Sequence, residues 1–291
     1  LMHWKTAIED FLTDEFGKQV QISSVNAVGG GSINSAYGLE TNVGKFFVKL
    51  NSASRYPKMF EKEALGLKIL SEAAELPVPV VAGFGESHAE AFLVLKFIET
   101  GMPSAGFWEN FGRALARLHG HTADTFGLDH DNYIGSLTQS NAFHNAWETF
   151  FVEERLQPLM GRAFDNKLLD NSDIKAFESF FARMDTLFPK EPPALLHGDL
   201  WSGNFMTNRD GEAVLIDPAV YYGHREMDLG MSQLFGGFHR RFYDAYNEIY
   251  PLETGWQKRL DYCNLYPLLV HVNLFGGSYV GSVRQILRLV S

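Results

Sequence analysis

Two short stretches of this sequence decide the fold: residues 197–204 read His-Gly-Asp-Leu-Trp-Ser-Gly-Asn, and residues 216–218 read Ile-Asp-Pro. Between them, Asp210-Gly211 is a strong signal for a two-residue hairpin turn, because both central positions of a type I′ turn need positive φ. Asn204 and Asp217 are equally far from this turn, on its two sides. Without a bulge, the two side chains are expected opposite each other on one face of the hairpin, with Cβ atoms about 5 Å apart.

An amide oxygen and a carboxylate that close can share a hard cation, which prefers oxygen ligands. In the structural alternative, Asp199 is a turn residue, Asn204 a cap and Asp217 a chance acid at the end of a strand. The occurrence of all three residues at this spacing favours the chemical interpretation.

The spacing His-x-Asp-x-x-x-x-Asn resembles the catalytic loop of protein kinases, with Gly198 where those enzymes have arginine. In that interpretation Asp199 accepts the proton of an attacking hydroxyl, and Asn204 and Asp217 hold Mg²⁺. The later Asp228-Leu229-Gly230 imitates the kinase Asp-Phe-Gly motif but has no hairpin partner. Asp228 is instead expected to cap the N-terminus of a helix and to brace the catalytic loop.

Composition excludes several classes of protein. The chain has 291 residues, 45% of them hydrophobic, which suffices for one large domain or two lobes. Its net charge of −10 argues against a nucleic-acid-binding surface, which should be basic, but does not exclude a basic substrate, which an acidic surface would attract. One cysteine, Cys263, cannot form an internal disulfide, so a reducing, cytoplasmic setting is expected. No apolar run reaches the roughly 18 residues of a membrane span, and no signal peptide is recognised.

The order of hydrophobic patterns predicts an α+β chain of two lobes, and the resemblance of residues 197–204 to the kinase catalytic loop implies a bilobal protein-kinase-like fold. An N-terminal antiparallel sheet lobe with one key helix is expected over residues 1–100, and a larger, mainly helical C-terminal lobe over 101–291. In the first lobe we expect helices at 3–16 and 58–74, and strands at 20–28, 36–41, 45–50, 80–85 and 91–98. In the second, the clearest helical patterns are at 107–118, 173–188 with Asp173 as its cap, and 229–238.

A glycine-rich stretch separates the first two predicted strands and supplies the first nucleotide-binding candidates. Without Cβ atoms, its backbone N–H groups can approach a phosphate closely, although a flexible hairpin tip explains it equally well. It matches neither the dinucleotide-binding pattern nor the P-loop. The candidates are Gly29, Gly30, Gly31, Ser32 and Asn34.

Lys49 and Glu63 are expected to form an ion pair. Lys49 lies on the third predicted strand, in the sequence Phe-Phe-Val-Lys, which resembles the kinase lysine that contacts nucleotide phosphates. Glu63 lies in the apolar stripe of the helix at 58–74, where an unpaired carboxylate would be costly. The alternatives are a surface lysine on a half-exposed strand and a glutamate in an i,i+4 surface pair.

Phe97, Ile98 and Glu99 end the fifth predicted strand. In a kinase-like chain this is the hinge, whose backbone groups would hydrogen-bond adenine. An ordinary strand-to-loop exit is the alternative, and the assignment depends on position alone.

Nearly the whole chain resembles the fructosamine kinase family. Trp201 and Ser202 in the catalytic loop separate that family from the wider aminoglycoside phosphotransferase and choline kinase group, which shares only His-Gly-Asp-x-x-x-x-Asn. The matching stretches are residues 196–204, 216–219 (Ile-Asp-Pro-Ala), 223–229 (Gly-His-Arg-Glu-Met-Asp-Leu), 274–277 (Leu-Phe-Gly-Gly), 29–34, 127–129 (Gly-Leu-Asp) and 131–135 (Asp-Asn-Tyr-Ile-Gly).

The resemblance implies ATP-dependent phosphorylation of the 3-hydroxyl of a sugar joined to an amine as a ketoamine, often on a protein lysine. The phosphorylated adduct is unstable, so the enzyme would reverse glycation. Bacterial members tend to favour ribulosamine and erythrulosamine adducts over fructosamines. We expect Trp201 to pack on the sugar, with a core tryptophan as the alternative. A monomer or weak homodimer is expected, without nucleic-acid or membrane partners.

Two other functions compete with this interpretation. The chain could phosphorylate another small hydroxyl compound, such as an aminoglycoside or a choline-like molecule. It could also be a non-catalytic nucleotide-binding scaffold, although every expected catalytic position is filled.

Overall fold

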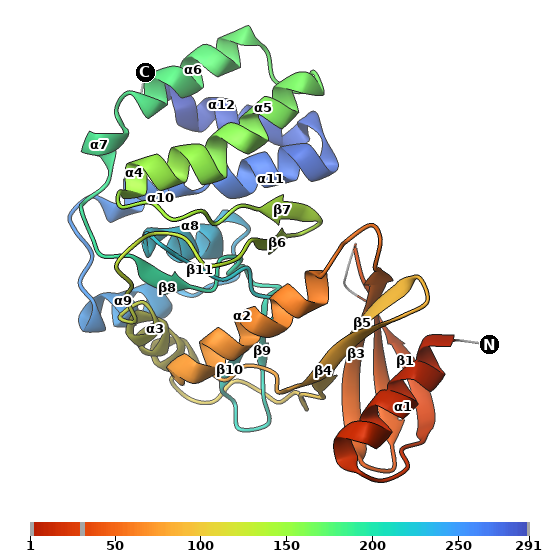
Figure 1. Ribbon diagram of the computed structural model, residues 1–291. Helices are drawn as coiled ribbons and strands as arrows, with labels where there is room; N and C mark the ends of the chain where they lie inside the picture. The colour runs from red at the N-terminus through yellow and green to blue at the C-terminus, as the bar shows by residue number, and fades with distance from the viewer. Residues whose placement is uncertain (1–2, 30–32, 290–291) are drawn as a thin grey trace. The chain divides into compact units, whose positions relative to one another are not determined.

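The computed structural model describes residues 3–29 and 33–289, and the chain divides into two compact units. The first unit comprises the chain up to residue 104 together with residues 206–216, and the second comprises residues 105–205 and the chain from 217 onward. The two units are described separately below (Figure 1). Local patterns placed only the first hundred residues in an N-terminal lobe, whereas residues 206–216 also pack with the first unit.

A five-stranded antiparallel sheet forms the body of the first unit, with the strand order β1-β2-β3-β5-β4. Every helix and strand predicted over the first 100 residues is present, with ends that shift by up to two residues. The elements are α1 (His3–Phe16), β1 (Ile22–Val28), β2 (Ser35–Thr41), β3 (Gly44–Ser52), α2 (Met59–Ala73), β4 (Val81–Ser87) and β5 (Glu90–Lys96).

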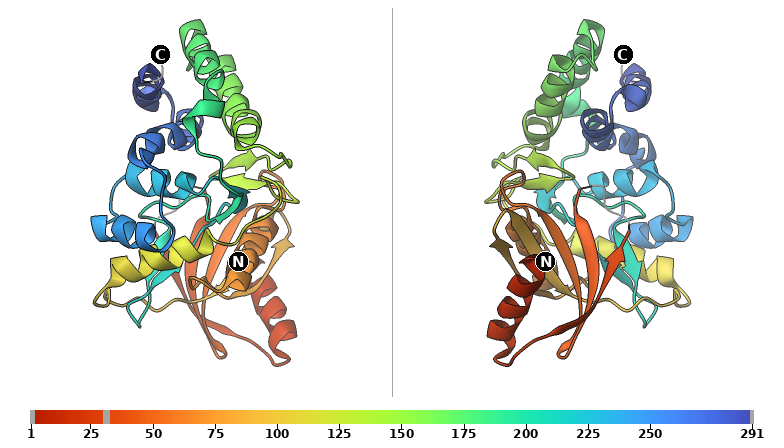
Figure 2. Two further views of the ribbon diagram at one scale, coloured as in Figure 1. Left: turned by 90° about the vertical axis from the view of Figure 1, so that its left-hand side faces the viewer. Right: turned by 90° about the vertical axis from the view of Figure 1, so that its right-hand side faces the viewer.

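Helices α1 and α2 cover opposite faces of this sheet (Figures 1 and 2). Alternation along β3 explains the arrangement, because successive side chains of a strand point to opposite faces. Phe46 and Val48 pack with the apolar residues of α1, and Phe47 packs with those of α2. Lys49 shares the face of Phe47, so the strand directs this lysine toward the α2 side.

A hairpin of β9 (Phe205–Thr207) and β10 (Ala213–Leu215) carries most of residues 206–216. The Gly211 amide donates to the Asn208 carbonyl at 3.0 Å, and the Asn208 amide donates to the Glu212 carbonyl at 3.0 Å. Gly211 has φ +76°, so the loop has three residues and ends in a left-handed glycine. The predicted two-residue turn is therefore wrong, and the strand register is displaced by one residue.

This displacement changes how Asn204 and Asp217 are brought together. Counted along the observed hairpin, Asn204 lies opposite Ile216, and both lie beyond the strand ends. Asp217 follows with φ +53°, a left-handed conformation that aspartate tolerates better than most residues. The position of the Asp217 carboxylate therefore depends on this backbone conformation, and not on strand pairing with Asn204.

The second unit is mainly helical, as predicted. Helices α5, α6, α11 and α12 form one helical group in Figures 1 and 2. Its elements are α3 (Phe107–Leu118), β6 (Asn132–Ile134), β7 (Leu137–Gln139), α4 (Trp147–Phe150), the π-helical turn η1 (Phe151–Leu156), α5 (Gln157–Asp165), α6 (Asn171–Phe181), α7 (Met184–Leu187), β8 (Ala194–Leu196), β11 (Tyr221–Gly223), α8 (Glu226–Leu234), α9 (Arg240–Ile249), α10 (Trp256–Cys263), α11 (Leu265–Phe275), the 3₁₀ turn η2 (Gly277–Tyr279) and α12 (Val280–Arg288).

Two predicted helix starts in this unit are wrong. Helix α6 is capped by Asp170, whose side chain accepts hydrogen bonds from the amides of Ser172 and Asp173. Asp173 is the third residue of the helix and completes the capping box, so it was mistaken for the cap itself. Likewise α8 begins at Glu226, which makes Asp228 part of its first turn rather than its N-cap. Asp228 was misplaced because local sequence does not reveal the partners described below.

Among the described residues, no helix is both long and apolar enough to cross a membrane.

Candidate functional site

The predicted ion pair between Lys49 and Glu63 forms within the first unit. The Lys49 Nζ lies 2.6 Å from the Glu63 Oε1, and the two side chains are only 6% and 11% exposed. The pair joins the middle of β3 to α2. Removing one partner of such a buried pair is costly, because it leaves the other charge without compensation.

Replacing Lys49 with methionine is expected to lower kcat by on the order of 10², the usual scale for losing one electrostatic contact to the reacting group. Lys45→Met is a matched control on the same strand, because the Lys45 side chain is 51% exposed and pairs with Glu99 at the surface. The measurement is kcat and the KM for ATP of both variants. Equal losses in both variants would contradict a specific role for Lys49.

The glycine-rich stretch is described in part. Gly30, Gly31 and Ser32 lie outside the described residues. A Cβ at Gly29 would meet nothing within 4 Å, so packing does not explain the glycine. The Asn34 Oδ1 accepts a hydrogen bond from Asn51 at 3.2 Å, which connects the end of this stretch to β3.

The predicted hinge residues Phe97, Ile98 and Glu99 follow the last residue of β5. The Phe97 amide donates to the Lys45 carbonyl at 3.2 Å, so this N–H is already used within the sheet. The Glu99 carboxylate pairs with Lys45 at 3.1 Å and with Arg209 at 3.5 Å. Backbone contacts to adenine would therefore fall to the Phe97 carbonyl, Ile98 or the Glu99 backbone.

In the second unit, Asn204 holds Asp199 from within the catalytic loop. The Asn204 Nδ2 donates to the Asp199 carbonyl at 2.8 Å and to its Oδ2 at 2.9 Å. The Asp199 amide donates to the His197 Nδ1 at 3.2 Å. Because the nitrogen of the Asn204 amide faces Asp199, the oxygen of the same amide faces away from it and remains available as a ligand.

The Asp199 carboxyl has an unusually high proton affinity. Its pKa is raised to about 7, mainly by withdrawal from water and to a smaller extent by the charges of Asp217 and Asp228, while the hydrogen bond from Asn204 acts in the opposite direction. A carboxylate with a pKa near neutrality suits a proton acceptor better than an ordinary aspartate does. Asp217 is near enough for its charge to raise the Asp199 pKa, and Asn204 contacts Asp199 directly.

Asp228 braces the catalytic loop, as expected, although it does not cap its helix. Its carboxylate accepts hydrogen bonds from the amides of His197 at 2.8 Å and Gly198 at 2.9 Å. The His119 Nε2 lies 3.1 Å from the same carboxylate, and the His119 Nδ1 lies 2.7 Å from the Tyr246 hydroxyl. Burial opposes ionisation of Asp228, but its interactions with His119, His197 and the Gly198 amide together outweigh burial and lower the pKa.

Gly198 is required by close packing. It has φ +85°, and a Cβ at this position would lie 1.9 Å from the Ala219 carbonyl oxygen. The Ala219 amide in turn donates to the His197 carbonyl at 2.9 Å. The arginine of protein kinases therefore cannot occupy position 198 without displacing the segment that follows Asp217.

Gly198→Ala is expected to lower the free energy of unfolding by about 2–4 kcal/mol, because it adds both a steric clash and an unfavourable backbone conformation. Gly161→Ala is the matched control: Gly161 lies inside α5, and a Cβ there would meet nothing within 4 Å. The control should gain about 0.5–1 kcal/mol from improved helix propensity. Denaturant unfolding of both variants tests this, and a neutral Gly198→Ala would refute the packing argument.

Trp201 lies at the surface, two residues beyond Asp199. Its indole is 38% exposed, and a Cβ at Gly203 would lie 2.2 Å from the indole, so Gly203 gives the ring room to fold back over the loop. The Trp201 ring also meets Phe235 edge-on at 6.2 Å. An exposed indole in this position is available to a ligand, whereas a core tryptophan would be buried.

Asn132 and Gln139 support the segment after Asp217, a role that the sequence did not reveal. The Asn132 Nδ2 donates to the Val220 carbonyl at 2.8 Å, and the Gln139 Nε2 donates to the Ala219 carbonyl at 3.2 Å. Both side chains are buried. Asn132 falls in a family-like stretch, but Gln139 gave no signal.

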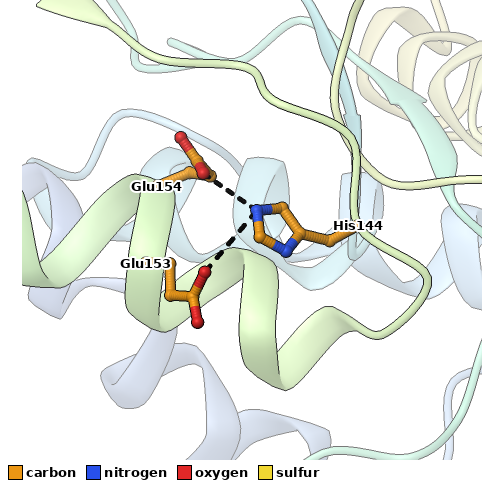
Figure 3. Close-up of side chains that lie close together, drawn as sticks. All are labelled: His144, Glu153 and Glu154. Atoms are coloured by element: carbon orange, nitrogen blue, oxygen red, sulfur yellow. Dashed lines mark hydrogen bonds and ion pairs between the residues drawn. The ribbon is translucent and has the colours of Figure 1, made fainter.

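A second group of potential metal ligands, His144, Glu153 and Glu154, lies elsewhere in this unit (Figure 3). The His144 Nε2 is 2.8 Å from Glu154 and 4.0 Å from Glu153. Ser140 donates a hydrogen bond to the other oxygen of Glu154. These contacts hold the 140–144 loop against η1, and this structural role explains why the three side chains lie together.

Comparisons with known proteins identify the family of this chain. The family model for fructosamine kinase matches residues 3–290. A ketoamine kinase homologue from Enterococcus faecium is 42% identical over 260 residues, which are 89% of this chain and 92% of the relative. A chloroplastic protein-ribulosamine 3-kinase from Arabidopsis thaliana is 41% identical over 276 residues, 93% of this chain and 83% of the relative.

Solved structures confirm the fold class. A structure from Thermobifida fusca assigned to fructosamine-3-kinase has a TM-score of 0.88 and 36% identity, and the match covers 98% of both chains. Aminoglycoside phosphotransferase APH(4)-Ia has a TM-score of 0.63 at 16% identity over 97% of this chain and 98% of its own, a likeness in fold alone. The predicted α+β protein-kinase-like fold is therefore confirmed, and the chain belongs to the fructosamine kinase family.

Proposed function

We propose that this protein is an ATP-dependent kinase that phosphorylates the 3-hydroxyl of ketoamine sugar adducts. The observation that carries the proposal is the Asp199 carboxylate, held by Asn204 at 2.9 Å and with its pKa raised to about 7 by burial. The names of the relatives support ketoamines as the acceptor class.

In the proposed reaction Asp199 takes the proton of the sugar hydroxyl while the hydroxyl oxygen forms its bond to the γ-phosphorus of ATP and the bond to ADP breaks. Asn204 keeps the Asp199 carboxylate in place through its two hydrogen bonds. Lys49 pairs with the phosphates and is itself held by Glu63. Gly29, Asn34, the hinge residues 97–99 and the undescribed Gly30, Gly31 and Ser32 are the further nucleotide-binding candidates.

The residues present fit a magnesium ion. The oxygen of the Asn204 amide faces away from Asp199, and Asp217 adds a carboxylate near enough to raise the Asp199 pKa. Oxygen donors of this kind suit Mg²⁺, with Asn204 and Asp217 as its protein ligands. When bound, the ion would neutralise charge on the transferred phosphoryl group.

Trp201 is proposed to pack against the sugar, because it is two residues beyond the base and its indole is 38% exposed. Phosphorylation of a ketoamine destabilises the adduct, so the biological outcome would be protein deglycation. We further propose a cytoplasmic enzyme, monomeric or weakly dimeric and without nucleic-acid partners. Buried Cys263 and the net charge of −10 support this assignment.

The test is ADP release from purified protein with ATP and Mg²⁺, using ribulose-, erythrulose- and fructose-lysine adducts and an aminoglycoside panel. Turnover on the ketoamines alone would support the proposal and rank the three sugars. Turnover on aminoglycosides alone would refute the acceptor but keep the catalytic roles. ATP binding without turnover on any acceptor would instead indicate a non-catalytic scaffold.

A further inference from the structure

Five rings of the second unit form a continuous aromatic surface that starts at the catalytic loop. Trp201 contacts Phe235 at 6.2 Å between ring centroids, and Phe235 contacts His271 at 4.8 Å. His271 contacts Phe275 at 5.3 Å and Tyr279 at 5.0 Å. We call these five residues the aromatic surface.

Three of the rings are substantially exposed: Trp201 at 38%, Phe235 at 41% and Phe275 at 55%. Single exposed aromatic residues are common on proteins, but a contiguous exposed group usually marks a binding surface. Only Phe235 among the other four rings contacts Trp201 directly, so a sugar packed on Trp201 alone would not account for the whole group.

The aromatic surface is anchored to the catalytic loop. Phe235 is the C-cap of α8, and Gly237, two residues later, packs on the loop. A Cβ at Gly237 would lie 2.6 Å from the Ser202 Cβ. The aromatic surface therefore begins at the loop that carries Asp199.

His271 gives this surface one polar contact. Its Nδ1 lies 2.7 Å from the Pro267 carbonyl, which fixes the hydrogen on Nδ1 and leaves Nε2 as an acceptor. Burial lowers the pKa of the ring, which favours this neutral form despite the hydrogen bond to Pro267. Among the residues that the structure describes, Nε2 has no hydrogen-bond partner.

We propose that the aromatic surface binds the lysine side of a glycated polypeptide: its charged secondary amine and the aliphatic stem behind it. This inference rests on the proposed function. A ketoamine nitrogen is basic and carries a positive charge at neutral pH, and ring faces attract such a cation. His271 Nε2 can accept its N–H, and the methylene stem packs on Phe275 and Tyr279. The chain's net charge of −10 also favours a cationic acceptor over a neutral one.

The experiment compares two acceptors that carry the same sugar and the same charged amine but differ in the stem: the ribulose adduct of an N-acetyl-lysine amide and that of methylamine. Phe275→Ala should raise KM for the lysine adduct about five- to tenfold and leave kcat within about twofold, because it removes binding rather than chemistry. KM for the methylamine adduct should stay within about twofold. His271→Leu should raise KM for both adducts, because both keep the amine.

Phe164→Ala is the matched control, since Phe164 is 39% exposed on α5 and lies outside the aromatic surface. Phe275→Leu keeps the apolar volume without a ring face and should show a smaller rise in the same KM. Equal changes with both adducts, or no change with either, would overturn this inference and leave the proposed function standing. Failure of the unmodified protein to phosphorylate any ketoamine would overturn both.

Discussion

Asp199→Asn is expected to lower kcat about 10²- to 10⁴-fold, the usual contribution of a positioned general base. The asparagine keeps an oxygen that can accept the hydrogen bond now made by Asn204, so the catalytic loop should retain its conformation. The loss should therefore appear in kcat, with the KM for ATP changed little. Residual activity within about tenfold of the parent protein would contradict the assignment of Asp199 as the base.

The same substitution should stabilise the protein in the absence of nucleotide and metal. The folded-state pKa of Asp199 is raised to about 7, so ionising this group disfavours the folded state. Below the unfolded-state pKa of about 4, Asp199 is protonated in both states and does not destabilise the folded protein. As the pH rises from about 4 toward 7, Asp199 ionises in the unfolded state first, so the free energy of unfolding falls. The Tm of the variant should therefore exceed that of the parent increasingly between pH 4 and 7, with no further change above pH 7.

Thermal unfolding across this pH range is the measurement, with Asp210→Asn as a control at an exposed carboxyl on the hairpin. The control should show no pH-dependent difference in Tm and full activity. A Tm difference for Asp199→Asn that is constant between pH 4 and 8 would contradict the raised pKa.

Asp228→Ala is expected to cost about 4 kcal/mol or more of the free energy of unfolding, or to abolish folding. The carboxylate is buried and accepts hydrogen bonds from two backbone amides as well as contacting His119. Alanine would leave these buried donors unsatisfied, at about 1–3 kcal/mol each. Asp228→Asn should cost less, because its amide oxygen still accepts one of the bonds.

Denaturant unfolding compares these variants with Asp244→Asn, whose side chain is 62% exposed and which should change stability by less than about 0.5 kcal/mol. The folded-state pKa of Asp228 is lowered, so its contribution is present above the unfolded pKa and is lost as the pH falls through the folded value. The difference between parent and Asp228→Asn should therefore shrink below about pH 4. A neutral Asp228→Ala would show that the catalytic loop does not depend on this brace.

Residue patterns within single helices and strands predicted those parts of the fold that depend on residues close together in the sequence. The period-two alternation of β3 and the stripe of α2 were sufficient to predict the Lys49–Glu63 pair, because each element fixes the face on which its residue lies. The hairpin register failed for an equally local reason. Asp210-Gly211 is compatible with a two-residue or a three-residue loop, and the choice moves Asn204 by one position relative to Asp217.

Long-range contacts account for what the sequence did not reveal. The bonds from His119 to Asp228 and from Gln139 to Ala219 join residues 109 and 80 positions apart, and no periodicity records such a pairing. His119 is the C-cap of α3, a position that does not by itself indicate a contact with Asp228. The aromatic surface was missed because Phe235, His271 and Phe275 are far from Trp201 in the sequence, and only the fold joins them into one group of ring contacts.

The central claim is that Asp199 directs phosphoryl transfer to the 3-hydroxyl of a ketoamine. The most direct measurement is phosphorus–proton correlation NMR of the product formed from the ribulose adduct of an N-acetyl-lysine amide with ATP and Mg²⁺. The account predicts a phosphorus nucleus coupled to the proton on carbon 3 of the sugar, and no such product from Asp199→Asn. Phosphate on another hydroxyl, or ADP released without a phosphorylated sugar, would contradict it.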